Sequence, residues 1–198
     1  MSVQSELQVI SGRLERGEID SAHYLEQLMR FVAAQVGCAR AGLRVFVDTA
    51  EGRALRCVAM YDAAADRMVT AIDIHQAGGG AYYECLQRDG SVIAARTDAI
   101  SAGPLRDYFD ASKVASLMDI GFSVNGVLFG TFSCEQLGEP GTWTQRQLQS
   151  LRRISSRASL TLMHVVTASI DTAPGALWET STPNRLATMQ MPLDPPDE

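Results

Sequence analysis

The sequence predicts an α+β domain built on one antiparallel β-sheet, with helices on both of its faces. Three observations support this fold class. Apolar residues recur at helical spacing near the N-terminus and in a long segment near the C-terminus, and shorter segments of alternating apolar residues lie between them. The pair Asn125-Gly126 separates two apolar runs, and it is typical of a two-residue hairpin turn because both positions require positive φ.

Two helices are expected at the start of the chain. Residues 2–16 carry apolar side chains at spacings of three and four, which predicts a narrow helical stripe. A second helix is expected over 21–36, where Asp20 can cap the first turn and Gly37 suits the C-terminal end. We assign 1–19 as a helical extension that precedes the domain.

Three strands are expected next. Residues 41–48 and 53–62 alternate apolar side chains and are expected to pair antiparallel around the turn at Glu51-Gly52. Residues 68–74 predict a weaker third strand.

The middle of the chain predicts short elements. Gly78-Gly79-Gly80 leads into a short helix over about 81–88, and a strand is expected at 91–95. Pro104 suits the start of another short helix. These segments are expected to arch over the sheet face that the terminal helices leave free.

The predicted hairpin brings an acid and two glycines onto one face. Regular pairing outward from the turn places Asp119 opposite Phe132 and Gly121 opposite Gly130. A pair of glycines requires a close neighbour, either a packed helix or a bound molecule. Asp119 needs a donor or a charge partner in a strand that is covered on both sides, so it either caps a nearby loop or binds a ligand amine or amide.

A long helix is expected near the C-terminus, over 144–169. Thr144 and Gln147 have the spacing of a capping box at its start. The composition changes at residue 171, where the chain becomes rich in Pro and Thr. We therefore expect a domain at 20–170 and a mobile tail at 171–198.

Composition limits the classes of function. The net charge is −6 and no basic tract occurs, which argues against partners such as nucleic acid or an anionic membrane. No apolar run reaches the roughly 18 residues that span a bilayer, and the N-terminus lacks an apolar secretory core, so a cytoplasmic protein is expected. The four cysteines are far apart and form no Cys-x-x-Cys or Cys/His cluster, so we expect reduced thiols and no metal site.

The C-terminal half of the sequence resembles the same half of a GAF domain. The resemblance is carried by "SVIAARTDA", "SLMDI", the strand "NGVLFGTFSCEQLG", "TWT" and the helix that follows. It extends over about 21–170 and is strongest over 92–165.

The resemblance implies both a fold and a role. GAF domains have a sheet of about six antiparallel strands, with the terminal helices on one face and a pocket under short helices and loops on the other, here at 75–113. They bind cyclic nucleotides, bilins, haem, amino-acid-like molecules or other small effectors. The resemblance implies a bacterial sensor in signal transduction that binds an unidentified small effector. It also implies a homodimer through the terminal helices and a separate signalling protein as partner.

The sequence departs from the best-known branches of the family. Bilin-binding GAF domains usually carry a Cys followed by His, whereas Cys85 is followed by Leu86 and Cys134 by Glu135. The signature of the cyclic-nucleotide branch is also missing. The resemblance therefore leaves the cofactor unknown.

Seven residues are candidates for ligand contacts in the implied pocket. Two of them, Tyr82 and Tyr83, open a helix after three glycines, where free backbone N–H groups can hold an anion. Each candidate has an alternative role in packing or capping. The full set is Tyr61, His75, Tyr82, Tyr83, Tyr108, Asp119 and Phe132.

Two alternatives to a sensor stay open. Cys85 lies on the expected pocket helix, so it is the candidate nucleophile of a reductase that acts on a small sulfoxide, similar to the free methionine sulfoxide reductases. The other alternative is a ligand-free GAF scaffold that serves only to pair proteins. As a sensor, the protein has no catalytic residue.

Overall fold

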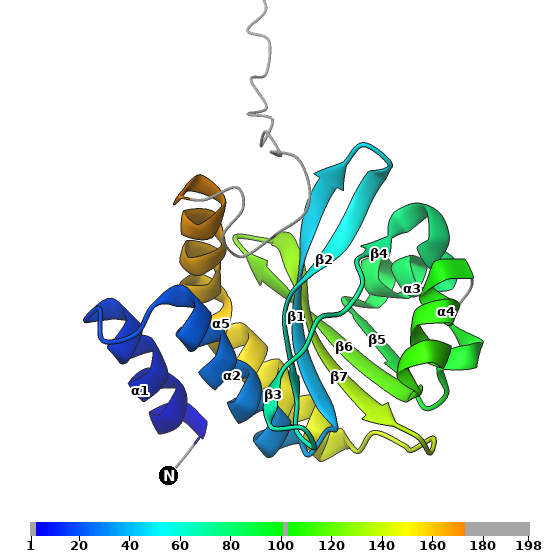
Figure 1. The fold of residues 1–198 in the computed structure, drawn as a ribbon, viewed down its shortest axis with the longest axis horizontal. Helices are drawn as coiled ribbons and strands as arrows, with labels where there is room; N and C mark the ends of the chain where they lie inside the picture. The colour runs from blue at the N-terminus through cyan, green and yellow to red at the C-terminus, as the bar shows by residue number, and fades with distance from the viewer. Residues whose placement is uncertain (1–2, 101–102, 173–198) are drawn as a thin grey trace, which may run out of the picture.

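The computed structural model describes residues 3–100 and 103–172, and its seven described strands form one antiparallel sheet with helices on both faces (Figure 1). The α+β prediction is therefore confirmed. The strands are β1 (Arg40–Thr49), β2 (Gly52–Asp62), β3 (Arg67–Met68), β4 (Ile74–His75), β5 (Ser91–Ala94), β6 (Val114–Val124) and β7 (Val127–Leu137). The helices are α1 (Val3–Glu15), α2 (Ser21–Val36), α3 (Gln76–Asp89), α4 (Gly103–Ser112) and α5 (Gln145–Thr172), with a 3₁₀ turn, η1 (Thr97–Ala99).

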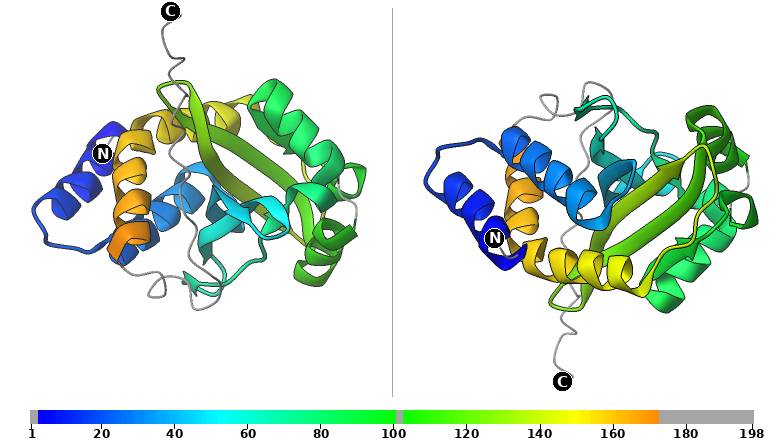
Figure 2. Two further views of the ribbon diagram at one scale, coloured as in Figure 1. Left: turned by 90° about the horizontal axis from the view of Figure 1, so that it is seen from above. Right: turned by 90° about the horizontal axis from the view of Figure 1, so that it is seen from below.

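The sheet separates two layers of helices. Its strand order is β3-β2-β1-β7-β6-β5, so β1, β7 and β6 lie in the middle. Helices α1, α2 and α5 cover one face, called here the terminal-helix face, and α3 and α4 cover the other, the short-helix face (Figures 1 and 2). Each face buries its own apolar core. In the described part of the chain, no helix is both long enough and apolar enough to cross a bilayer.

The ends of the long helices follow the capping rules. Asp20 precedes α2, and its Oδ1 accepts a hydrogen bond from the His23 N–H at 2.8 Å. Gly37 ends the helix with φ 72°, a conformation that costs glycine little. Before α5, the Thr144 N–H donates to Gln147 Oε1 at 2.9 Å and the Gln147 N–H donates to Thr144 Oγ1 at 3.3 Å. The predicted caps are confirmed.

Two of the middle elements differ from the prediction. The expected strand over 68–74 is wrong, because only the two-residue strands β3 and β4 form at its ends. The segment between them contacts β2 through a side chain instead of a backbone ladder. The Asp73 carboxylate accepts from the Arg56 Nε–H at 3.1 Å and from the Cys57 backbone N–H at 3.2 Å. Helix α3 is longer than expected, and Gly80 interrupts it with φ 31° and ψ −118°.

The hairpin of β6 and β7 forms as predicted, but its register is wrong beyond the first pairs. Val124 faces Val127 and Ser123 faces Leu128, whereas Phe122 faces Gly130. Phe129 is therefore an extra residue in β7, a β-bulge.

The bulge changes which side chains share a face. Asp119 pairs with Ser133 instead of Phe132, and Leu117 pairs with Glu135. Phe132 pairs with Ile120 and lies in the core of the terminal-helix face. The strand also continues to Leu137, so the Cys134-Glu135-Gln136 segment lies within β7.

The described residues include only part of the predicted division into an N-terminal extension, a domain and a C-terminal tail. Helix α5 runs to Thr172, and the predicted tail from residue 173 onward lies outside the described residues.

Candidate functional site

Six polar side chains meet beneath α3 and α4, on the short-helix face of the central strands. All of them are buried. We call this set the polar cluster. It comprises Arg44 on β1, Asp119 on β6, Ser133 and Glu135 on β7, Tyr82 on α3 and Tyr108 on α4.

Asp119 has donors on both of its carboxylate oxygens. The Tyr82 hydroxyl donates to Oδ2 and the Ser133 hydroxyl donates to Oδ1, each at 2.5 Å. Burial raises the pKa of Asp119, although these two donors and Arg44 oppose the rise. The same burial, together with the neighbouring Asp119 carboxylate, raises the pKa of the Tyr82 hydroxyl well above its usual value.

Arg44 and Glu135 form the charged part of the cluster. Arg44 Nη2 lies 3.9 Å from Glu135 Oε1, and the Tyr108 hydroxyl donates to the same oxygen at 2.9 Å. The Arg44 Nη1–H donates to the Ile72 carbonyl at 2.5 Å. Burial raises the pKa of Glu135, opposed by the nearby guanidinium. Within this pair of side chains, Arg44 Nε and Glu135 Oε2 are buried without a hydrogen-bond partner among the described residues, as is Thr131 Oγ1 on β7.

The helices that cover the cluster are short and packed through aromatic side chains. Tyr82 and Tyr83 contact each other edge to face, with ring centroids 5.7 Å apart, and Tyr108 contacts Phe109 at 5.6 Å. The break at Gly80 divides α3 just before these tyrosines. The cover is therefore made of two short helices that hold the cluster by one tyrosine hydroxyl each.

The raised pKa of Asp119 gives a testable pH dependence. An acid whose pKa is higher in the folded state stabilises the fold fully below its unfolded pKa of about 4, and this contribution is lost as the pH rises through the folded pKa. Replacing Asp119 by asparagine removes the titration and keeps the shape. We expect Asp119→Asn to gain unfolding free energy relative to the wild type as the pH rises from 4 to 7, measured by urea denaturation.

The control for this experiment is Asp107→Asn, which removes an exposed carboxylate from α4. Its unfolding free energy should follow the wild type at each pH. A constant difference between Asp119→Asn and the wild type across the range would contradict the prediction.

The structure brings together only part of the predicted set of site residues. Tyr82, Tyr108 and Asp119 belong to the polar cluster. Tyr83 lies in the apolar cover, where its hydroxyl donates to the Ile74 carbonyl at 2.7 Å and burial raises its pKa to about 12. His75 lies at the start of α3, with its Nδ1 3.7 Å from Glu51 Oε2.

Two predicted residues lie on the other side of the sheet. Tyr61 packs in the core of the terminal-helix face, with the Arg30 guanidinium 4.7 Å from its ring centroid and its hydroxyl donating to Asp66 Oδ1 at 2.6 Å. Phe132 contacts Phe122 in the same core, at 5.9 Å between centroids. Tyr61 and Phe132 therefore do not share a face of the sheet with Asp119. For Phe132 the cause is the bulge, which shifts the register of β7.

Sequence reasoning missed Arg44, Ser133 and Glu135. A signal existed for Arg44, since it lies within the apolar strand segment "GLRVFV" of a sheet that was expected to be covered on both faces. Glu135 gave no such signal, because it lies near the C-terminal end of β7, where an acid is compatible with solvent exposure.

The cysteines occupy different places in the fold. Cys38 and Cys134 are buried on the terminal-helix face. Burial raises the pKa of Cys134 well above its usual value, and it also raises the pKa of Cys57. Cys85 on α3 is half-buried, with Arg88 Nη2 3.8 Å from its Sγ. The reductase alternative stays a prediction.

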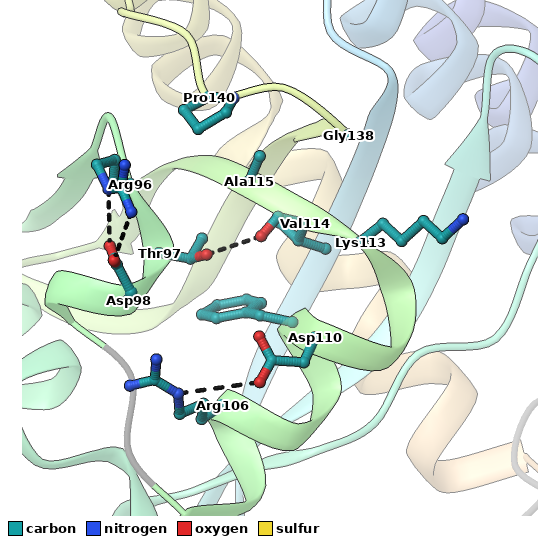
Figure 3. Close-up of a pocket in the computed structure, with 11 residues that line it drawn as sticks. Arg96, Thr97, Asp98, Arg106, Asp110, Lys113, Val114, Ala115, Gly138 and Pro140 are labelled. Atoms are coloured by element: carbon teal, nitrogen blue, oxygen red, sulfur yellow. Dashed lines mark hydrogen bonds and ion pairs between the residues drawn. The ribbon is translucent and has the colours of Figure 1, made fainter.

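A pocket lies outside the polar cluster, between η1, α4, the start of β6 and the end of β7 (Figure 3). Its volume is about 430 Å³. Each of its two arginines is paired with an aspartate: Arg96 Nη2 lies 2.8 Å from Asp98 Oδ2, and Arg106 Nε lies 3.9 Å from Asp110 Oδ2. Both arginines of this pocket are paired, whereas the polar cluster holds buried polar atoms without partners, so we place the candidate site at the polar cluster.

Several solved structures share the fold. The phycocyanobilin-bound GAF domain from a cyanobacterial phytochrome is 14% identical with a TM-score of 0.64, and the match covers 85% of this chain and 97% of that one. The GAF domain from an Acinetobacter phosphoenolpyruvate-protein phosphotransferase is 12% identical with a TM-score of 0.61, covering 84% and 97%. The photosensory core module of a Stigmatella aurantiaca phytochrome is 18% identical with a TM-score of 0.57, covering 81% of this chain but only 36% of that one.

A comparison with curated proteins found no match. The sequence model of the GAF domain family matches residues 22–162, which include the seven strands of the described residues and the polar cluster. The chain therefore belongs to the GAF domain family.

Proposed function

We propose that this GAF domain is a sensor that binds a small polar molecule at the polar cluster and acts in signal transduction. The ligand lies between the central strands and helices α3 and α4. In this proposal the protein works in the cytoplasm of a bacterium, through a separate signalling protein. The phycocyanobilin-bound GAF domain of similar fold supports a small-molecule role, since its architecture holds a ligand.

The observation that carries the proposal is the pair of unpartnered atoms, Arg44 Nε and Glu135 Oε2. A buried polar group without a partner costs about 1–3 kcal/mol, and more when the group is charged. Native proteins keep few such groups, and each one that persists needs a physical reason, such as a functional role or a bound water or ion. Here a donor and an acceptor are both open within one buried cluster.

These two atoms define the ligand by its chemistry. Arg44 Nε offers an N–H, so it requires an acceptor on the ligand, and Glu135 Oε2 requires a donor. A molecule with a carbonyl and an N–H, such as an amide, a lactam or an amino acid, meets both needs. The surrounding tyrosine rings provide aromatic surface for the rest of the molecule.

A contact behind the cluster offers a route for the signal. The Ser155 hydroxyl on α5 donates to the Gly121 carbonyl on β6 at 3.3 Å, two residues from Asp119. A ligand that holds α3 and α4 closed selects one arrangement of β6, and α5 follows it as a population shift.

The experiment is native mass spectrometry of freshly purified full-length protein, with Glu135→Gln as the variant. Glutamine keeps the shape, but its amide N–H₂ replaces an acceptor by a donor. We expect the wild type to carry a small molecule. The variant should bind it about tenfold to a hundredfold more weakly, the effect of losing a hydrogen bond to a charged group.

The matched control is Glu84→Gln, which changes an exposed carboxylate on the same covering helix α3. It should keep the bound species at the wild-type level. A wild-type protein without any bound molecule, whose melting temperature no amide, lactam or amino acid raises, would contradict the proposal and favour the ligand-free scaffold.

A further inference from the structure

The outer side of α5 is cationic in an otherwise acidic chain. Between residues 145 and 170 the sequence has four arginines and no acid, while the whole chain has a net charge of −6. All four arginines are exposed. Among the described residues no ion pair is found for any of them, although nine of the chain's other arginines are paired.

Five exposed side chains and the half-buried Ser150 on this side of α5 follow the spacing of a helix-packing seam. The steps between them alternate between four and three residues, which keeps them in one row along a helix. From first to last the row extends about 27 Å, at 1.5 Å per residue. We call this row the α5 seam; its members are Arg146, Ser150, Arg153, Arg157, Leu160 and His164.

The seam also offers apolar contact beside its charges. Leu160 is 63% exposed, so its apolar side chain is accessible to a partner beside the arginines. A groove of about 330 Å³ runs alongside, between α1 and α5. It is lined by Leu7, Gln8 and Ser11 from α1 and by Arg157, Ala158 and Thr161 from α5. Figure 2 shows α1 lying next to α5 on the terminal-helix face.

From these features we infer that the α5 seam docks an acidic helix of a separate protein. The partner helix carries glutamate or aspartate at alternating spacings of three and four residues, opposite the arginines, and an apolar residue near Leu160. Helices of this kind pack along such a seam, and opposite charges across it select the partner. This inference does not depend on the ligand at the polar cluster.

The charge of the seam argues against a second copy of this chain as the occupant. In a parallel pair Arg153 and Arg157 would each face themselves, and in an antiparallel pair Arg153 would lie close to Arg157 of the second copy. Either arrangement brings cations together, which is destabilising. A nucleic acid or an anionic membrane would satisfy the charges but would leave Leu160 and the apolar side of the groove unused.

The test uses the full-length protein and a designed helical peptide, labelled with fluorescein, with glutamate at each seam position except one leucine opposite Leu160. Binding is measured by fluorescence anisotropy at 50 and 300 mM salt. We expect the double variant R153E/R157E to bind the peptide at least about tenfold more weakly, because two attractive pairs become repulsive. Salt should weaken the binding of the wild type.

The control variant is R152E, which removes the same charge from the same helix. Arg152 lies about 100° around the helix from Arg153 and outside the seam, so its effect should stay below about twofold. A matching peptide with lysine in place of glutamate should prefer R153E/R157E to the wild type. Circular dichroism melting checks that both variants fold.

Four results would overturn the inference. One is a wild type that binds the glutamate peptide no more tightly than the lysine peptide, and another is an R152E variant that weakens binding as much as the double variant. The third is binding to phosphatidylserine vesicles or duplex DNA that is tighter than peptide binding and is lost in R153E/R157E. The last is sedimentation showing that the double variant dissolves a wild-type homodimer.

Discussion

Replacing Arg44 by methionine is expected to reduce the free energy of unfolding by about 3–5 kcal/mol at pH 7, the usual cost of removing one partner of a buried ion pair. Arg44 is 1% exposed and Glu135 is fully buried. The substitution removes the nearest cation from Glu135 Oε1 and leaves the Ile72 carbonyl without its donor. Urea denaturation followed by circular dichroism measures the loss.

The design includes a variant that repairs the charge. In R44M/E135Q the buried carboxylate is neutral, while the glutamine oxygen still accepts from Tyr108, so we expect the double variant to recover at least about half of the loss. Burial already raises the pKa of Glu135. Without Arg44 the pKa rises further, so the deficit of R44M should shrink as the pH falls and the carboxyl group is protonated. A loss below about 1 kcal/mol would contradict the assigned role.

Replacing Gly130 by alanine is expected to cost about 3 kcal/mol or more, or to prevent folding, because overpacked sites without room to relax lie at the high end of such effects. A Cβ at this position would lie 2.0 Å from the Arg44 carbonyl oxygen and 2.9 Å from Val45 Cα. Both atoms belong to the backbone of β1, which cannot move aside as a flexible side chain can. The measurement is thermal and urea denaturation of any soluble variant.

Gly141→Ala is the matched control, since a Cβ there meets nothing within 4 Å. Its free energy of unfolding should stay within about 0.5 kcal/mol of the wild type. The sequence predicted a close neighbour at Gly130, as either a helix or a ligand, but the neighbour is the adjacent strand. A G130A variant as stable as the wild type would contradict this prediction, because it would mean that β1 and β7 can move apart at little cost.

Most of the fold was predictable because local rules determine it. Capping residues mark the start of α2 and α5, glycine in the left-handed region ends α2, and Asn125-Gly126 forms the hairpin turn. Each of these signals depends on residues within one turn of the chain, so a single sequence is enough to find them.

The register of the hairpin was not predictable from such rules. Phe129 is an apolar residue in an apolar strand, and nothing in its neighbours distinguishes it as the bulged position. The bulge depends on how β7 packs between β1 and β6, which is a property of the whole sheet. One extra residue was enough to move Phe132 away from Asp119 and to bring Ser133 beside it.

Only those strand residues of the site were predictable that are polar within an apolar segment of the sequence. Asp119 was found because an acid in a covered strand needs a partner. Its actual partners, Tyr82 and Ser133, lie 37 and 14 residues away along the chain. Three of the four strand residues of the cluster are absent from the predicted set. The face of the sheet on which each one lies depends on how strands far apart in the sequence pair.

The central position of the polar cluster has a thermodynamic consequence. Its strand residues come from β1, β6 and β7, and adjacent central strands commonly open only when a domain melts as a whole. A molecule that binds there in the proposed way contacts strands of the sheet centre, so its binding free energy adds to the free energy of global unfolding. Saturation at a hundred times the dissociation constant would add about 2.7 kcal/mol to the resistance of the entire domain against heat or protease.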